Sequence, residues 1–178
     1  MDIVLLTGIV GGCMLVLGAA WQEQNVKNNP LHSVKDWLLF IGGVILLIYA
    51  ILGFFLQHSS PFFIFLELLT LVASILMMLN TDDRFDTIFL SLLGLGFIAW
   101  SLSLSLSIDT VWFIVGLTGI AVGYALTPGW KRDLAFTLGS TCVCIFSFLV
   151  GSWVFFWLNV FFALFSLFWL LRSFTKKA

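Results

Sequence analysis

Seven long apolar stretches, separated by short polar segments, make up most of the chain. Each is 17 to 21 residues long, and they cover residues 3–20, 37–57, 62–80, 87–107, 111–127, 134–151 and 153–171. A helix of roughly 20 apolar residues crosses the hydrocarbon core of a bilayer. The pattern therefore predicts an all-α integral membrane protein with seven transmembrane helices.

The boundary between the last two stretches needs an argument, because residues 134–171 contain no charge. One helix of that length would measure roughly 57 Å at about 1.5 Å per residue, almost twice the hydrocarbon thickness. Gly151 and Ser152 have the composition of a turn. We therefore predict that the chain reverses there.

Composition excludes two broad classes of protein. The chain is 61% hydrophobic and only 10% charged, whereas soluble domains are about 45–50% apolar and about 25% charged. Its net charge of −1 leaves no basic surface for a nucleic acid. We expect the lipid bilayer to be the main partner, and no nucleic acid.

The distribution of Lys and Arg predicts the orientation. With an external N-terminus, all eight basic residues fall in segments on the inner side, where such residues accumulate. Merging the last two helices would put three of them outside. The prediction is an integral protein of the cell (plasma) membrane with its N-terminus outside and its C-terminus inside.

Two parts of the sequence resemble each other. Leu-Thr-Gly-Ile occurs at residues 6–9 and again at residues 117–120, and a second glycine follows each copy, at Gly12 and Gly123. Glycines four residues apart let helix backbones approach closely, which is a packing role. The similarity predicts an internal repeat.

The repeat predicts how the chain is organised. Residues 1–80 would form the first triple-helix repeat, residues 81–110 a linker transmembrane helix, and residues 111–178 the second triple-helix repeat. Each repeat would begin outside and end inside. Two parallel copies with a solute site at their interface are a recurring transporter plan, so we expect a 3+1+3 arrangement.

Glu67 is the one residue within the predicted spans that ionises near neutral pH. A charge at the centre of a bilayer costs roughly 2.5 to 3.5 kcal/mol on insertion scales. The spans contain no Lys, Arg or His that would pair with it. We therefore expect Glu67 either to be protonated or to face a water-filled cavity.

Asn159 lies six residues after Trp153, as Glu67 lies six residues after Pro61. The repeat therefore predicts that both side chains lie at matching depth and face one central binding site. The alternative is structural: Glu67 would bond a neighbouring hydroxyl or carbonyl, and Asn159 would tie two helices together.

Three aromatic residues are further candidates for contact with a solute. Trp100 and Trp157 lie deeper than the interfacial belts in which tryptophan is common, so they could stack on a ligand or simply pack. Tyr49 offers a hydroxyl group inside the second span. Few other polar side chains are available to line a path through the membrane.

The sequence gives little support for an enzyme. Asp82-Asp83-Arg84-Phe85-Asp86 resembles a DDxxD motif, which needs a second acidic cluster that no other loop supplies. Asp86 is better explained as the N-cap of the fourth helix. The three cysteines have no metal-site spacing. We expect no enzymatic activity, no metal and no cofactor.

A set of features in residues 21–79 is similar to a known family pattern. They are Gln22, Ser33-Val34-Lys35, Ile41-Gly42, Ile48-Tyr49-Ala50, Pro61 and a polar residue in the third helix. Together they resemble a PQ-loop repeat of the SWEET and SemiSWEET transporters. The resemblance implies seven helices, an external N-terminus and two parallel triplets.

The sequence also departs from that family. Its Pro-Gln pair is Trp21-Gln22 in the first repeat and Pro128-Gly129 in the second, so Pro128 alone could serve as a hinge. Glu67 and Asn159 stand where the family has a pair of asparagines. These changes remove the expectation of a sugar substrate, and a carboxyl group suits a cationic solute or proton coupling.

The predicted function is small-solute transport by alternating access around a site between the two repeats. The alternative is a non-transporting membrane protein of the same fold, acting as a scaffold, a receptor or a complex subunit. A small polar solute is the expected ligand, and a homo-oligomer is possible in either case.

Overall fold

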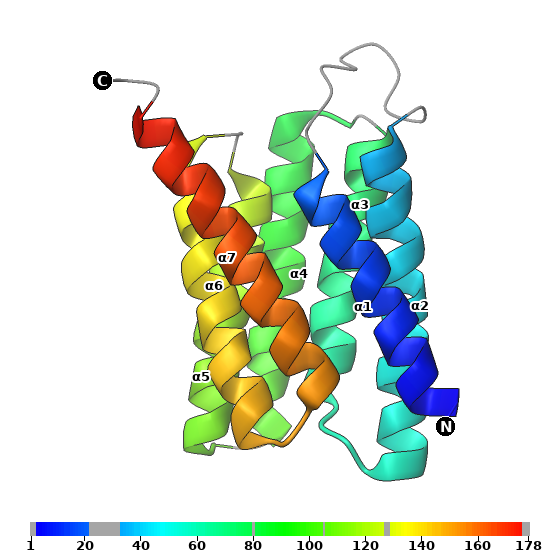
Figure 1. Ribbon diagram of the computed structural model, residues 1–178. Coiled ribbons are helices and arrows are strands. Elements are labelled where there is room, and N and C mark those ends of the chain that lie inside the picture. Colours follow the sequence, from blue (N-terminus) through cyan, green and yellow to red (C-terminus); the bar gives the residue numbers. More distant parts are fainter. Residues whose placement is uncertain (1–2, 22–32, 80, 105, 127–128, 176–178) are drawn as a thin grey trace. The chain divides into compact units, whose positions relative to one another are not determined.

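A computed structural model describes residues 3–21, 33–79, 81–104, 106–126 and 129–175. These residues form seven α-helices and no strand (Figure 1). The helices are α1 (Ile3–Ala20), α2 (Val34–Gln57), α3 (Phe62–Leu79), α4 (Asp83–Leu104), α5 (Ile108–Ala125), α6 (Trp130–Leu149) and α7 (Trp153–Thr175).

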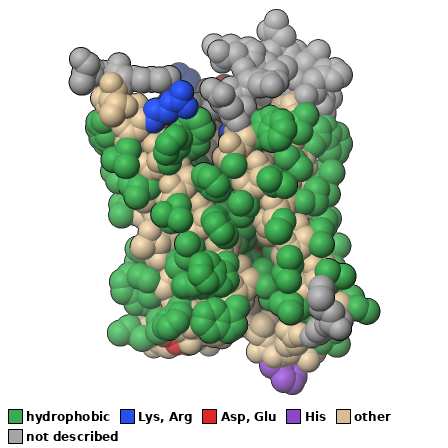
Figure 2. Space-filling view, viewed as in Figure 1, with side chains coloured by type: hydrophobic (Ala, Val, Ile, Leu, Met, Phe, Trp, Pro, Cys, Tyr) green, Lys and Arg blue, Asp and Glu red, His purple; other side chains and the backbone are tan. Residues whose placement is uncertain are grey.

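Each helix is long and apolar enough to cross a membrane. Large hydrophobic side chains are exposed along all of them, and residues such as Ile3 (75% exposed) and Leu92 (64%) have no protein core to enter. Figure 2 shows hydrophobic side chains covering most of the visible helical face. Such a surface is stable in lipid rather than in water, so the fold is that of an integral membrane protein.

The predicted turn between the last two helices is confirmed. Gly151 has a φ of 70°, a left-handed conformation that glycine adopts without a steric penalty. The backbone N–H of Ser152 donates to the carbonyl of Ser147 and closes the turn. Serines also begin two other helices, because the hydroxyls of Ser33 and Ser107 accept from backbone N–H groups in α2 and α5.

The chain divides into two compact units, Met1–Asp82 and Asp83–Ala178. In the first unit, α2 contacts both α1 and α3. In the second unit, α4 contacts α5, α5 contacts α6 and α6 contacts α7. Within each unit, helices that follow one another in sequence are therefore neighbours, as Figure 1 shows for α1 with α2 and for α6 with α7.

Glycines bring α1 and α2 into close contact. A Cβ atom added at Gly42 would lie 2.9 Å from the backbone nitrogen of Leu15 and 3.1 Å from the carbonyl oxygen of Gly11. A Cβ added at Gly11 would lie 3.0 Å from the backbone nitrogen of Leu46. Only glycine lets the two backbones approach this closely.

The same arrangement joins α5 and α6 in the second unit. A Cβ added at Gly139 would lie 2.7 Å from the backbone nitrogen of Ile120 and 2.9 Å from the carbonyl oxygen of Gly116. A Cβ added at Gly116 would lie 2.9 Å from the backbone nitrogen of Val143. The two crossings therefore have the same kind of contact.

Their registers also correspond. Several contacts of the first crossing become contacts of the second when the first helix is shifted by 105 positions (Gly11 to Gly116) and the second by 97 (Gly42 to Gly139). Four pairs follow this rule: Gly11–Leu46 with Gly116–Val143, Leu15–Gly42 with Ile120–Gly139, Gly18–Leu39 with Gly123–Phe136, and Gly8–Tyr49 with Phe113–Phe146.

This register corrects the alignment predicted from the Leu-Thr-Gly-Ile segments, which paired Gly8 with Gly119 and Gly12 with Gly123. A Cβ added at Gly12 would meet nothing within 4 Å, whereas one at Gly123 would lie 2.7 Å from the ring of Phe136. Gly18 is the residue that matches Gly123. Apolar helices share short motifs by chance, and the packing identifies which glycines correspond.

The fourth helix begins earlier than predicted. It starts at Asp83, so Asp86 lies inside its first turn and is not the N-cap. The hydroxyl of Thr87 donates to the carbonyl oxygen of Ala125 at 3.1 Å and so satisfies a backbone acceptor at the end of α5. This bond fixes the start of α4 to the end of α5.

Candidate functional site

Glu67 is buried in α3. Its exposed fraction is 2%, and it follows two other buried residues, Phe63 (1%) and Leu66 (3%), on the same side of the helix. The hydroxyl of Thr70 is 3.4 Å from Oε2 of Glu67 and 3.1 Å from the Glu67 carbonyl oxygen. Within the described residues, the carboxyl group of Glu67 therefore has one hydrogen bond, and that bond is long and weak.

The described part of the chain offers the Glu67 carboxyl group no cationic partner. Among the residues that the structure describes, no Lys, Arg or His lies within ion-pair distance of Glu67. A buried carboxylate with neither a cation nor several donors is strongly disfavoured. In this arrangement the carboxyl group is stable when protonated, or when water or a solute reaches it.

Asn159 is buried in α7. Its exposed fraction is 4%, and Nδ2 donates to the carbonyl oxygen of Phe155 at 2.8 Å. That bond lies within one helix turn, so it does not tie α7 to another helix. Phe155 (1%) and Leu158 (6%) are buried beside it.

The two polar residues follow the same pair of buried residues in their helices. Glu67 follows Phe63 and Leu66 as Asn159 follows Phe155 and Leu158, with the same spacing and the same burial. Glu67 lies on the helix that follows the α1–α2 crossing, and Asn159 lies on the helix that follows the α5–α6 crossing. Whether the two side chains face one solute site stays a prediction.

Tyr49 belongs to the α1–α2 crossing. Its ring covers Gly8, where an added Cβ would lie 2.9 Å from Cδ2 and from Cε2 of the tyrosine. The ring thus has a packing role within the first unit. In the second unit, Phe146 occupies the equivalent position and contacts Phe113, with ring centroids 5.1 Å apart.

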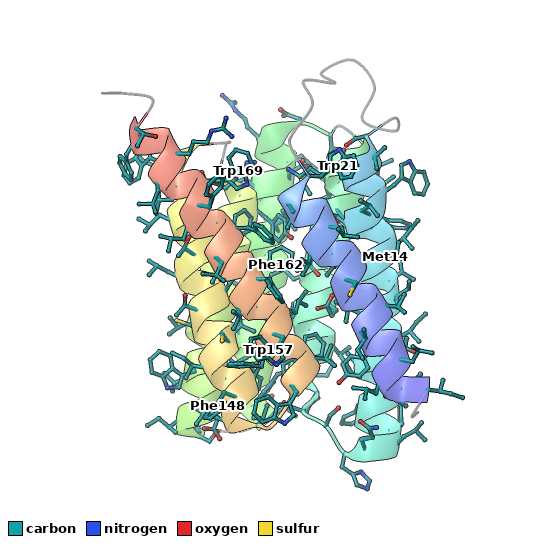
Figure 3. All side chains as sticks on the ribbon, viewed as in Figure 1. Met14, Trp21, Phe148, Trp157, Phe162 and Trp169 are labelled. Carbon is teal, nitrogen blue, oxygen red and sulfur yellow. The ribbon has the colours of Figure 1, made fainter. Side chains whose placement is uncertain are left out.

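The two tryptophans proposed for solute stacking lie on the surface of the second unit. Trp100 is 56% exposed and Trp157 is 55% exposed. Figure 3 shows Trp157 on α7 and Phe148 near the turn that joins it to α6. The ring of Phe156 lies 5.2 Å from Trp157 and 5.8 Å from Phe148, so these aromatic residues form a surface cluster.

The proposed hinge residue, Pro128, lies outside the described residues. The next described residue, Gly129, has a φ of 157° and caps α6 without a side-chain hydrogen bond. The hinge role stays a prediction.

One polar residue escaped attention in the sequence. Thr70 stands three residues after Glu67, which is the helical spacing for a side-chain contact, and this spacing was the available signal. Serine alternates with leucine in residues 101–107, and a serine in a helix usually bonds a carbonyl of the preceding turn. Ser101 differs, because it is fully buried in α4 and within the described residues its hydroxyl has no hydrogen-bond partner.

Among the described residues, no three His, Cys, Asp or Glu side chains come together as a possible metal site. Comparison with known protein families, with curated proteins and with solved structures gives no match. The proposed function therefore depends on the residues themselves.

Proposed function

We propose that this protein is a small-solute membrane transporter of SWEET-like plan, with Glu67 and Asn159 in its solute path. The proposed layout has two parallel triple-helix repeats joined by α4, in a 3+1+3 order, and works by alternating access. The observation that supports it best is Glu67: a carboxyl group, 2% exposed, in a helix with no other ionisable residue.

The position of Glu67 is energetically unfavourable. A carboxyl group inside a bilayer is disfavoured by roughly 2.5 to 3.5 kcal/mol on insertion scales. Thr70 offsets part of this with one long hydrogen bond, and a typical hydrogen bond contributes only about 1 kcal/mol. A leucine at this position would be more favourable for folding, so the acidic residue needs a reason beyond stability.

The matching position of Asn159 supports the same proposal. Both residues occupy the same place relative to a buried phenylalanine and a buried leucine, and one is acidic while the other is neutral. A carboxyl group and a carboxamide together offer acceptors for an ammonium group and a donor for a carbonyl. We therefore propose a cationic or amine-bearing solute, or a polar solute carried together with a proton.

Uptake into proteoliposomes tests the proposal. A thermal-shift screen of amines and other small metabolites on the purified chain supplies the solute to label. We expect Glu67→Gln and Asn159→Ala each to lower its uptake at least tenfold, about 1.4 kcal/mol of lost interaction. Thr141→Val is the matched control, because the Thr141 hydroxyl also lies in a helix but bonds only the Thr137 carbonyl. Wild-type uptake by both variants would disprove the site.

Chemical labelling gives a second, independent readout. Hydrophobic carbodiimides modify protonated carboxyl groups in apolar surroundings. We expect labelling at Glu67, slowed by the transported solute. Labelling at the same rate with and without solute would contradict a solute path beside Glu67.

A non-transporting membrane protein is the second candidate, and one observation favours it. Several hydroxyls in the helices bond their own backbone and so leave few polar groups to line a path. Examples are Thr7 to Ile3, Ser74 to Thr70, Thr118 to Ile114 and Ser147 to Val143. Failure of every solute to enter proteoliposomes, combined with stable folding of Glu67→Leu, would favour this candidate.

A further inference from the structure

Cations and indole rings cluster where α6 begins and α7 ends. We call this cluster the basic-aromatic end, and it consists of Trp130, Lys131, Arg132, Trp169 and Arg172. The ring of Trp130 lies 6.2 Å from that of Phe174, so the start of α6 adjoins the end of α7. Figure 3 shows Trp169 toward the C-terminal end of α7.

Two of the cations lie over indole rings. The guanidinium carbon of Arg172 is 5.2 Å from the centre of the Trp169 ring, and Nζ of Lys131 is 5.8 Å from the centre of the Trp130 ring. These are cation–π distances. A cation held beside an amphipathic ring is typical of the headgroup region, where one side of the pair meets acyl chains and the other meets water.

The charge at these two helix ends is not balanced. The first turn of α6 contains one acidic residue, Asp133, whose Oδ1 is 4.0 Å from Nε of Arg132. That acid lies beside Arg132, while Lys131 and Arg172 are held by indole rings. Lys176 and Lys177 follow in the sequence, outside the described residues. The start of α4 differs, because Arg84 there has acidic neighbours in sequence on both sides.

We propose that the basic-aromatic end binds the phosphate headgroups of anionic phospholipids. Charge complementarity selects an anionic headgroup over a zwitterionic one, and the indole rings hold the cations at the level of the phosphates. The predicted orientation puts this end at the inner leaflet, where anionic lipids are common. This proposal is independent of transport.

A lipid titration of the purified full-length chain tests the proposal. The melting temperature of the chain in neutral detergent is measured while dioleoylphosphatidylglycerol is added. Two parallel titrations use dioleoylphosphatidylcholine and inorganic phosphate instead. We expect phosphatidylglycerol to act at the lowest concentration. The double variant Lys131→Gln with Arg172→Gln should raise the phosphatidylglycerol concentration at half-maximal stabilisation (the midpoint) at least tenfold, since each surface cation contributes about fivefold to the affinity. Added salt should weaken the effect in the wild type.

Matched variants distinguish binding at this cluster from a general effect of the protein's net charge. Lys35→Gln with Arg84→Gln removes two cations as well, and should move the midpoint by less than about twofold if the cluster is specific. Lys131→Arg with Arg172→Lys keeps both charges and should keep the wild-type midpoint within that range. If the double glutamine variant does not fold, Lys131→Gln alone should still give about a fivefold shift, because Lys131 is exposed.

Three results would overturn the proposal. One is an unchanged midpoint in the glutamine variants, and another is an equal shift in the Lys35 and Arg84 control. The third is stabilisation by phosphatidylcholine or by inorganic phosphate at the same concentration as phosphatidylglycerol, which would show a nonspecific lipid effect or a site for the free anion.

Discussion

The α1–α2 crossing of the first unit and the α5–α6 crossing of the second share a register but are filled differently. In the first, the ring of Tyr49 covers Gly8. In the second, Phe146 meets another ring, Phe113, at 5.1 Å. The close backbone contact is common to both, while the side chains beside it differ. The comparison shows that glycine determines how these helices meet, and that the neighbouring side chains adapt.

Helices α3 and α7 differ in chemistry. Glu67 in α3 and Asn159 in α7 each follow a buried phenylalanine by four residues and a buried leucine by one, yet one carries an ionisable group and the other does not. The position is polar in both units, but only the first can change its charge. If the units cooperate in transport, the first would provide proton coupling and the second a neutral contact.

The largest expected effect is at the aromatic pair of the second crossing. Phe146→Ala removes a fully buried ring and leaves a cavity, so we expect it to lower the free energy of unfolding by about 3–5 kcal/mol. Tyr49→Ala should cost less, because Tyr49 is partly exposed and faces a glycine. Unfolding in mixed detergent micelles measures both. Equal losses would show that the two crossings depend on their rings to the same degree.

The next effect concerns the glycines. Gly139→Ala places a methyl 2.7 Å from the backbone nitrogen of Ile120, and Gly42→Ala places one 2.9 Å from that of Leu15. Because backbone atoms cannot move aside, each should lower the free energy of unfolding by about 1–3 kcal/mol. Gly12→Ala is the control, since a methyl there meets nothing within 4 Å.

A smaller effect is expected at the two polar positions. Glu67→Leu and Asn159→Leu should each leave the free energy of unfolding unchanged or raise it, because replacing a buried polar group by an apolar one is often neutral or stabilising. Uptake should nevertheless be lost. A loss of stability above about 2 kcal/mol with uptake retained would assign both residues to structure instead.

The smallest effect distinguishes two buried serines in the second unit. Within the described residues the hydroxyl of Ser101 has no hydrogen-bond partner, whereas that of Ser147 donates to the Val143 carbonyl at 2.7 Å. We expect Ser101→Ala to be neutral or stabilising and Ser147→Ala to cost about 0.5–1 kcal/mol. The same unfolding assay compares them, and a clear loss at Ser101 would reveal a partner for that hydroxyl.

The sequence predicted the helices well because membrane spans are set by length and hydropathy alone. It placed the turn at Gly151 correctly. Helix ends were less accurate: α2 begins at Val34 rather than at residue 37, and α7 continues to Thr175 rather than ending at 171. Polar residues outside the hydrocarbon region can extend a helix, and hydropathy does not detect that extension.

The candidate site was predictable only in part. Glu67 and Asn159 stand out because they are polar in apolar segments. The exposure of Trp100 and Trp157 could not be predicted, since a helix that is apolar on every face gives no periodic signal for its buried side. The register of the first helix of each pair was also hidden, because leucine, glycine and isoleucine are too common in membrane helices to align reliably.

Residues 21–33 connect α1 to α2, whereas the much shorter segment 126–129 connects α5 to α6. The two helix pairs nevertheless meet in the same register, so the connecting segment does not select the pairing. A polypeptide ending within 21–33, co-expressed with the remainder of the chain, should therefore reassemble with it. Fragment complementation is thus a practical route to labelling the first helix alone.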